Sequence, residues 1–461
     1  MKEESIVGKI IIKGKLRLES PLIIGGGKNE FVDIEVLKDR NGTPFIPATS
    51  VIGVLRHYFN DNFPEKKGDQ FDYFWGISEK IDPDKLKSIQ STFICHDLNS
   101  SETKISVRDG VRIDPGKQIA EDEGKYDFEI IEKGAEFDLF WEVTLRQIHD
   151  KDTFKQILGT MIEALKSGIS IGAKTNNGFG KCKLNDVKIL EFDFSKKDDV
   201  SEWLRQDFSS GKTSSDFIPY KKNNNVFSVD ATFAVKNSII VRAYSEKIDM
   251  PDAASITSNG EFILPGTSIK GAIRNRASKI LKTLVKEGDN QKIEQKINHL
   301  FGTAGKNNDN EKIKSRVLIE EREIKGVKPE LQTRIKIDRF TGGTVKSALF
   351  DTMPLWSSGE QDRSVNINIY IRDYKEWEAG LILHVLKDLW CEDLPIGGEK
   401  NVGRGVLKGI YACIKWKDSK GKDKKIEIRS DGKGGISSGE SNVSELNNFS
   451  NNLKEEVRLW K

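Results

Sequence analysis

Apolar and polar residues alternate along residues 10–18, which predicts a β-strand with one apolar and one basic face. The alternating positions are Ile12, Leu16 and Leu18 against Lys13, Lys15 and Arg17. Further along, the pattern predicts an amphipathic helix over 50–59, a strand over 137–143, a second helix over 152–166 and a closing strand over 181–192. The first part of the chain therefore has the order strand–helix–strand–helix–strand, with long insertions.

The same order returns in the second half, with strands over 226–235, 365–371 and 405–416 and helices over 268–284 and 373–390. Four sequence blocks recur in the same order at offsets of 218 to 226 residues. TPFIPATSVIGVLR at 43–56 matches EFILPGTSIKGAIR at 261–274, and IGAKTNNGFG at 171–180 matches IGGEKNVGRG at 396–405. The other two pairs are Arg112-Ile113-Asp114 with Lys336-Ile337-Asp338, and Phe74-Trp75-Gly76 with Leu300-Phe301-Gly302. This ordered recurrence indicates an internal duplication.

The duplication predicts two α+β domains in tandem. We assign a first domain to 1–193, a polar linker to 194–225, a second domain to 226–416 and a polar, flexible tail to 417–461. The linker could hold one helical turn around Trp203, and the last residues of the tail, 453–461, could form a short helix. Strands that alternate with helices in this order predict a ferredoxin-like antiparallel sheet with its helices on one face, used twice.

Composition narrows the class of protein. The chain has 461 residues and a formal net charge of +3, so any surface for nucleic acid must be a local patch. No apolar run is long enough to span a membrane, and the N-terminus lacks the pattern of a secretory signal. The four cysteines are scattered without metal-ligand spacing, which favours a reducing, cytoplasmic location.

The glycine-rich loops are candidates for binding phosphate. They are not Rossmann or P-loop motifs, because a helix precedes each loop and a strand follows it. They are typical either of a helix-to-strand connection or of a backbone N–H cradle for phosphates. The polar residues of these loops are Lys174, Asn176 and Asn177 in the first copy and Lys400, Asn401 and Arg404 in the second.

The repeated TS-x-x-G-x-x-R segments place hydroxyls and backbone N–H groups at two helix N-termini, where anions bind well. We expect Thr49, Ser50, Thr267 and Ser268 to cap these helices, with basic residues within two turns. The basic residues are Arg56, Lys270 and Arg274. An ordinary capped helix with solvated basic residues is the alternative, but the duplication favours phosphate binding.

Two loop aspartates occupy similar positions in the repeats. Asp33 precedes the Asn41-Gly42 turn by 8 residues, and Asp252 precedes the Asn259-Gly260 turn by 7. Asp249 matches less well. The five histidines do not recur between the repeats, so they do not support a histidine acid–base pair for RNA cleavage.

Together these segments resemble the RAMP superfamily, and specifically the backbone subunits of type III CRISPR effector complexes. The resemblance rests on LIIGGGKNEFVDIEVLKDRNGTPFIPATSVIGVLR, ISIGAKTNNGFGK, PDAASITSNGEFILPGTSIKGAIR, LPIGGEKNVGRG and RIKIDRFTGGTVKSALFDTMPLW. It covers nearly the whole chain except the linker and tail. The chain departs from the family pattern in having two fused units and Ala48 where the family prefers glycine.

The resemblance implies a ribonucleoprotein of antiviral defence, in which the chain binds guide RNA beside other subunits of the effector complex. A hairpin "thumb" from each domain would interrupt the duplex of guide and complementary target RNA. Arg112, Ile113, Lys336 and Ile337 fall in the segments expected to form the thumbs. A loop aspartate beside each interruption would cut the target RNA with a divalent metal ion, Mg²⁺ or Mn²⁺.

For that aspartate the resemblance selects Asp33, because it lies six residues before Asp39 as in the family. Asp252 corresponds through the duplicated turn, although its spacing is one residue shorter, and Asp249 is its alternative. Two other functions remain open: a scaffold that binds guide RNA without cutting, and an endonuclease that processes the guide. The second is disfavoured because no histidine or tyrosine candidate recurs between the repeats.

Overall fold

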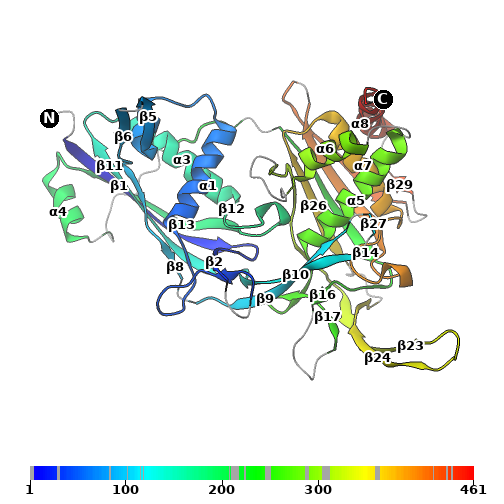
Figure 1. Ribbon diagram of the computed structural model, residues 1–461. Helices are drawn as coiled ribbons and strands as arrows, with labels where there is room; N and C mark the ends of the chain where they lie inside the picture. The colour runs from blue at the N-terminus through cyan, green and yellow to red at the C-terminus, as the bar shows by residue number, and fades with distance from the viewer. Residues whose placement is uncertain are drawn as a thin grey trace. The chain divides into compact units, whose positions relative to one another are not determined.

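The structure is a computed structural model of the 461-residue chain, shown in Figure 1. It describes residues 5–28, 32–82, 85–100, 102–114, 116–117, 119–206, 208, 217–222, 225–243, 251–285, 290–303, 312–358, 364–418, 420–431, 435–437 and 440–460. The chain divides into two compact units. Unit 1 comprises Met1–Val107, Asp127–Thr175 and Phe179–Asn223, and unit 2 comprises Arg108–Tyr126, Asn176–Gly178 and Asn224–Lys461.

Unit 1 is built on an antiparallel sheet with the strand order β12-β13-β1-β11-β7. The strands are β1 (Ile6–Leu18), β7 (Phe93–Cys95), β11 (Glu136–Arg146), β12 (Ile169–Ser170) and β13 (Lys181–Asp193). The helices of this unit are α1 (Ala48–Asn62), α2 (Asp69–Trp75), α3 (Lys151–Ser167) and α4 (Lys197–Arg205). Without β12, the four strands in chain order lie as fourth, first, third and second, which is the ferredoxin-like arrangement.

The core of unit 1 follows from the alternation in β1. Ile10 and Ile12 lie on its apolar face and are fully buried. Helix α1 contributes Val51, Leu55 and Phe59, which recur every four residues and so lie on one side of the helix. A smaller cluster covers the opposite face of the sheet, where Ile11, Leu190 and Phe192 contact Trp203 of α4.

Unit 2 repeats the arrangement, with the strand order β20-β26-β14-β27-β28-β29. The strands are β14 (Val226–Val235), β20 (Val317–Ile319), β26 (Val365–Arg372), β27 (Leu407–Lys417), β28 (Asp423–Ser430) and β29 (Ile436–Ser437). The helices are α5 (Gly266–Val285), α6 (Asn290–Phe301), α7 (Glu376–Trp390) and α8 (Glu440–Arg458). The predicted class, two ferredoxin-like α+β domains in tandem, is confirmed.

Two elements of each repeat were not expected. The edge strands β7 and β20 have three residues each, too few for an alternating pattern to be recognised. Helices α2 and α6 lie in the long insertions and end at the recurring aromatic–glycine block, at Trp75 and Phe301. Gly76 and Gly302 then adopt positive φ angles of 74° and 82°, so the duplication extends to these turns.

The prediction of a flexible tail from residue 417 is wrong for its described part. Strand β28 pairs with β27 from Tyr411↔Arg429 to Lys417↔Asp423 and widens the sheet. Helix α8 buries Phe449 and Leu453 in the core of unit 2. The short helix expected over 453–461 is the end of this longer one, and a polar composition hid the rest, because only a narrow row of apolar residues at helical spacing contacts the core.

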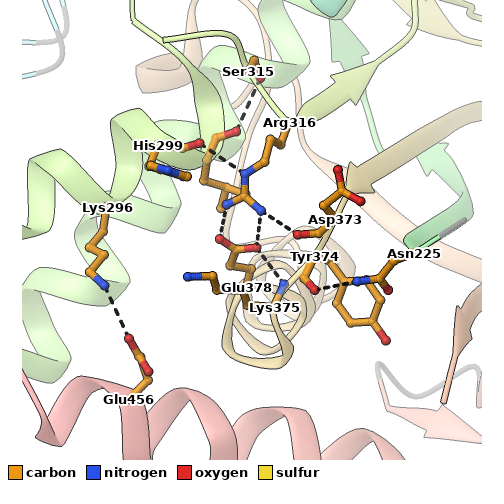
Figure 2. Close-up of polar contacts among 11 residues, drawn as sticks. Asn225, Lys296, His299, Ser315, Arg316, Asp373, Tyr374, Lys375, Glu378 and Glu456 are labelled. Atoms are coloured by element: carbon orange, nitrogen blue, oxygen red, sulfur yellow. Dashed lines mark hydrogen bonds and ion pairs between the residues drawn. The ribbon is translucent and has the colours of Figure 1, made fainter. Parts of the chain in front are cut away.

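Polar contacts join the helices of unit 2 to one another and to residues next to its strands, as Figure 2 shows. Arg316 forms an ion pair with the buried Glu378 of α7 and also donates to the carbonyl oxygen of Asp373 at 2.9 Å. Lys296 of α6 donates to Glu456 of α8 at 3.4 Å. These contacts tie the last helix of the chain to the same unit as the second repeat.

Each long insertion contains a two-stranded hairpin. The first consists of β9 (Ile105–Ile113) and β10 (Ala120–Ile131), and the second of β23 (Gln332–Ile337) and β24 (Thr344–Met353). In Figure 1 the β23–β24 hairpin extends as an arm from the rest of unit 2. Residues 108–126 of the first hairpin also belong to unit 2, where Arg108 pairs with Glu321 at 2.5 Å and both side chains are buried.

Short strands complete the two units. They are β2 (Gly25–Gly27), β3 (Glu35–Val36), β4 (Phe45–Ile46), β5 (Ile77–Asp82), β6 (Lys85–Ile89), β8 (Leu98–Asn99), β15 (Ser238–Ile239), β16 (Arg242–Ala243), β17 (Ala253–Ser255), β18 (Thr257–Ser258), β19 (Glu261–Leu264), β21 (Arg322–Glu323), β22 (Val327–Pro329) and β25 (Leu355–Ser357). Within the described ranges, no helix is long and apolar enough to cross a membrane.

Candidate functional site

Asp33 lies in an exposed bend immediately before β3 and is held against β10. Its backbone N–H donates to the carbonyl oxygen of Asp127 at 3.0 Å, and its Oδ2 accepts the N–H of Asp127 at 3.2 Å. Lys28 Nζ lies 3.7 Å from the other carboxylate oxygen. The aspartate is therefore fixed by the strand that forms the second half of the first hairpin.

Asp252 has a similar position in unit 2. It lies in an exposed bend before β17, and its Oδ2 accepts the N–H of Asp351 on β24 at 2.9 Å. In both units the residue after the aspartate forms a parallel bridge with the hairpin strand, Ile34 with Phe128 and Ala253 with Thr352. The structure thus gives Asp33 and Asp252 equivalent positions. Asp249 lies outside the described residues.

Sequence reasoning missed the residues that hold these aspartates. Asp127 and Asp351 are 224 residues apart, the offset found for the thumb motif, and this recurrence was the available signal. Among the described residues, no three histidine, cysteine, aspartate or glutamate side chains group closely enough to hold a metal ion by themselves. A single exposed carboxylate is nevertheless a chemically suitable Mg²⁺ ligand, because Mg²⁺ commonly binds one or two carboxylates together with phosphate oxygens of the substrate.

The expectation that hydroxyl residues cap the two helices is wrong. Helix α1 begins at Ala48 with Pro47 at its N-cap, and α5 begins at Gly266. The four predicted capping residues lie one and two positions inside the first turn: Thr49, Ser50, Thr267 and Ser268. The rigid proline sets the start of the helix, which leaves both threonine side chains exposed.

The basic residues on these helices have different environments. Arg56 is exposed, whereas Arg274 donates to the carbonyl oxygen of Gly302 at 2.8 Å and to Asn298. Lys270 is 8% exposed. Its Nζ donates to the carbonyl oxygen of Asn176 at 3.1 Å and to the hydroxyl of Ser315 at 2.8 Å. Burial, with a smaller contribution from Arg274, lowers the pKa of Lys270 to about 7.

The two glycine loops share one backbone conformation. Each contains a single 3₁₀ turn, Thr175–Asn177 and Lys400–Val402, preceded by a left-handed residue. A Cβ atom on Gly180 or Gly405 would lie 1.8 or 1.9 Å from a main-chain oxygen. These two glycines are therefore required by packing within the protein, as a helix-to-strand connection would require.

The side chains of the two loops differ. Lys174 Nζ lies 3.8 Å from the centre of the Phe128 ring, and burial lowers the pKa of Lys174 to about 8. The corresponding left-handed residue of the second loop is Glu399, which sequence reasoning did not select. Glu399 pairs with Arg242 at 2.8 Å and with Arg404 at 2.7 Å.

Accessibility separates the remaining predicted residues of the loops. The Arg404 side chain is 3% exposed. It also donates to the Ser238 hydroxyl and to Gln332. Asn176 and Asn177 are half-buried. Lys400 and Asn401 are exposed. The second loop therefore leaves Lys400 and Asn401 accessible, while Arg404 supports the loop from inside.

The predicted thumb residues lie at the ends of hairpin strands. Arg112 and Ile113 end β9, and Lys336 and Ile337 end β23, and all four are exposed. The aspartate that follows each pair forms the turn. A contact of these residues with a guide–target duplex remains a prediction.

The comparisons with known proteins agree with this duplication. The family model described as "RAMPs: RAMP superfamily" matches the chain twice, over residues 15–183 and 248–408. No curated protein sequence matches the chain. The two matched regions together cover most of the chain, and one falls in each of the two repeats, so the protein belongs to the RAMP superfamily as a tandem member.

Proposed function

We propose that the chain is an RNA-binding backbone subunit of a type III CRISPR effector complex that cuts target RNA at two places. Membership of the RAMP superfamily supports a CRISPR-associated, RNA-binding role. The cutting groups would be Asp33 and Asp252. Guide RNA, complementary target RNA and further subunits of the complex would be its partners.

One observation carries the nuclease part of this proposal: the two aspartates occupy equivalent positions beside the two hairpins. Each carboxylate accepts an N–H from the hairpin strand, at 3.2 Å for Asp33 and 2.9 Å for Asp252. Each aspartate also lies beside a strand of a hairpin whose exposed end could separate a base pair. The recurrence of this main-chain contact in both copies supports a role that the two aspartates share.

The chemistry requires little from the protein beyond geometry. A nucleotide turned out of its stack can place its 2′-hydroxyl in line with the adjacent phosphate, and holding this geometry accelerates the attack. A divalent metal ion held by the aspartate and phosphate oxygens would stabilise the developing negative charge. The hairpin N–H keeps the carboxylate in a fixed orientation during this step.

The accessible polar residues would contact the RNA backbone directly. These are Thr49, Arg56, Thr267, Lys400 and Asn401, all exposed. Lys174, Ser50, Ser268, Asn176 and Asn177 are half-buried and would lie further from the RNA. Lys270, Arg274 and Arg404 bond within the protein, so a phosphate would have to compete with existing partners.

Mapping the cuts on a target RNA tests the nuclease function. The full chain, assembled with its guide RNA, is incubated with complementary labelled target and Mg²⁺ or Mn²⁺. We expect Asp33→Ala to abolish one cut and Asp252→Ala to abolish another, with guide and target binding unchanged. Glu261→Ala, which removes an exposed carboxylate beside the Asn259-Gly260 turn, is the matched control and should leave both cuts.

The two cuts should be separated by one thumb interval, because the repeats are consecutive units along one guide. If Asp252→Ala leaves every product in place, the second repeat is a scaffold only or Asp249 acts there. If both variants cut as the wild type does, the nuclease function is refuted. The chain would then be a guide-binding scaffold.

Salt dependence tests the RNA contacts. Arg56→Ala and Lys400→Ala should each weaken guide binding and reduce the slope of log K against log salt by about one, because each removes a phosphate contact. An unchanged affinity and slope in both folded variants would refute these contacts.

A further inference from the structure

Asp252 lies beside a four-stranded sheet of unit 2 whose strand order is β16-β17-β24-β23. The aspartate immediately precedes β17, and its Oδ2 accepts the N–H of Asp351 on β24 at 2.9 Å. Strand β17 pairs with β16 on one side and with β24 on the other, over only two residue pairs each. Because a main-chain hydrogen bond contributes little net free energy, these short pairings alone hold the strand weakly.

Glu399 of the second glycine loop connects the two outer strands of this sheet. Its carboxylate pairs with Arg242 of β16 at 2.8 Å and with Arg334 of β23 at 3.0 Å. A third guanidinium, that of Arg404, lies 2.7 Å from the carboxylate oxygen that Arg334 also contacts. One side chain therefore ties together the strands on either side of β17 and β24.

The charge of Glu399 is needed where it lies. Its side chain is 7% exposed. Burial by itself would raise the pKa of Glu399, but hydrogen bonds from Arg242 and Arg404 outweigh burial, and the pKa is lowered. The carboxylate is therefore ionised and stands among three cations. Removing its charge would leave three guanidinium groups that repel one another, and the two outer strands would lose their connection.

The first repeat has different residues at these positions. Lys174 stands at the position of Glu399, and its Nζ lies over the Phe128 ring. In both repeats a carbonyl oxygen accepts an N–H from the glycine loop two residues before the position of the β16 arginine, which aligns that arginine with Gly25. The offset of 224 residues aligns the β23 arginine with Gly110. Any role of this cluster is therefore confined to the second repeat.

We propose that Glu399 is a positioning residue for the second cut, because it holds Arg242 and Arg334 and thereby keeps the strands around Asp252 in place. The proposal rests on the proposed function and adds a requirement that the first cut does not have. A misplacement of about 1 Å can slow a reaction that depends on geometry about 100-fold. Without Glu399, Asp252 would remain present and exposed but would be displaced from the phosphate.

The test compares the two cuts on one target RNA. The full chain, assembled with its guide RNA, is mixed in excess with labelled complementary target, and the rate of each cut is measured over a range of protein concentrations. For Glu399→Gln, the saturated rate of the cut that depends on Asp252 should fall about 10- to 100-fold. The half-saturating concentration and the rate of the first cut should change less than about twofold, so the first cut is an internal standard for folding, assembly and binding.

Glu392→Gln is the matched control. Glu392 also has a left-handed backbone and an ion pair, with Lys236, but it lies outside this sheet, so its replacement should leave both cuts unchanged. Arg242→Met breaks the same connection from its 39% exposed end and should also slow only the second cut. The double variant Glu399→Gln/Arg242→Met should be no slower than the slower single variant, because the two residues form one connection.

The inference is overturned if Glu399→Gln makes the second cut as fast as the wild type does, or if it slows both cuts equally. It is also overturned if the losses multiply in the double variant, because Arg242 would then act independently of Glu399. If Glu399→Gln does not assemble, Arg242→Met decides: a normal second cut overturns the inference and a selective loss supports it. In each of these cases the wild-type cuts remain and the proposed function stands, whereas a wild type in which no cut depends on Asp252 refutes this inference together with the proposed second cut.

Discussion

Lys270 is a buried lysine on α5, and we expect it to make the stability of unit 2 depend on pH. Its Nζ donates hydrogen bonds to the carbonyl oxygen of Asn176 and to the hydroxyl of Ser315. Burial lowers the pKa of Lys270 to about 7, against 10.5 for an exposed lysine. Folding therefore disfavours the charged form. Lys270→Met removes the titrating group and keeps most of the side-chain volume.

The sign and size follow from proton linkage. Below pH 7 the group is protonated in both the folded and the unfolded state, so it adds no pH dependence. Above pH 7 the folded state releases the proton and the unfolded state keeps it up to about pH 10.5, so stability rises with pH in this window. Between pH 6 and pH 8 the wild type should gain roughly 1–2 kcal/mol relative to Lys270→Met.

Hydrogen exchange of the α5 amides measures this difference locally. The opening free energies of wild type and Lys270→Met are compared at pH 6 and pH 8, after correction for the intrinsic exchange rate at each pH. Lys282→Met, at an exposed lysine on the same helix, should show no pH-dependent difference. The reasoning is refuted if the advantage of the wild type is equal at both pH values or decreases as pH rises.

The same pKa has a consequence for RNA binding. If a guide phosphate reaches Lys270, the bound state needs the charged lysine, so binding must take up a proton above pH 7. Guide affinity should then fall between pH 6 and pH 8 in the wild type and become less dependent on pH in Lys270→Met. Equal pH dependence in both proteins would show that Lys270 has only its observed internal partners.

Three further predictions concern stability and are measured by urea unfolding. Gly266→Ala should destabilise unit 2 by about 1–3 kcal/mol, because its Cβ would lie 2.4 Å from a main-chain oxygen, whereas Gly271→Ala on the same helix has open space and should stabilise by up to about 1 kcal/mol. Arg108→Met should cost about 3–5 kcal/mol by leaving Glu321 buried without its cation, and adding Glu321→Met should recover part of this loss. Leu453→Ala should lower the free energy of unfolding by about 2–5 kcal/mol, because Leu453 of α8 is buried in the core. A loss below about 0.5 kcal/mol would show that α8 does not contribute to the core.

Much of the fold could be predicted, because the sequence patterns that indicate it are local and occur in both repeats. Alternation in residues 10–18 gave the central strand of unit 1, since burial on one face of a sheet repeats every second residue. The recurring glycine-rich block at 396–405 predicted the second helix-to-strand loop at its observed position. Strand β7 could not be predicted from three residues, because its strand character comes from pairing with Trp141 and Val143 far along the chain.

The site was predictable only in part, for a related reason. Asp33 and Asp252 could be selected from their spacing to a turn, which is a local property. Their partners could not, because Asp127 and Asp351 approach them only after the hairpin strands have paired. The buried position of Arg404 was equally hidden, since its sequence neighbours are glycines and its partner Glu399 was not recognised.

The divergence between the repeats limits which residues can perform a function shared by both. Lys174 and Glu399 have nearly the same left-handed backbone, with φ angles of 55° and 54°, yet opposite charges. A phosphate contact common to both loops therefore cannot depend on that side chain and must use the main chain or a residue that recurs. The aspartate before each hairpin does recur, with the same main-chain partner in both units. We therefore expect a cutting activity shared by both repeats to depend on a carboxylate that recurs, and Asp33 and Asp252 are a recurring pair that is exposed beside the two hairpins.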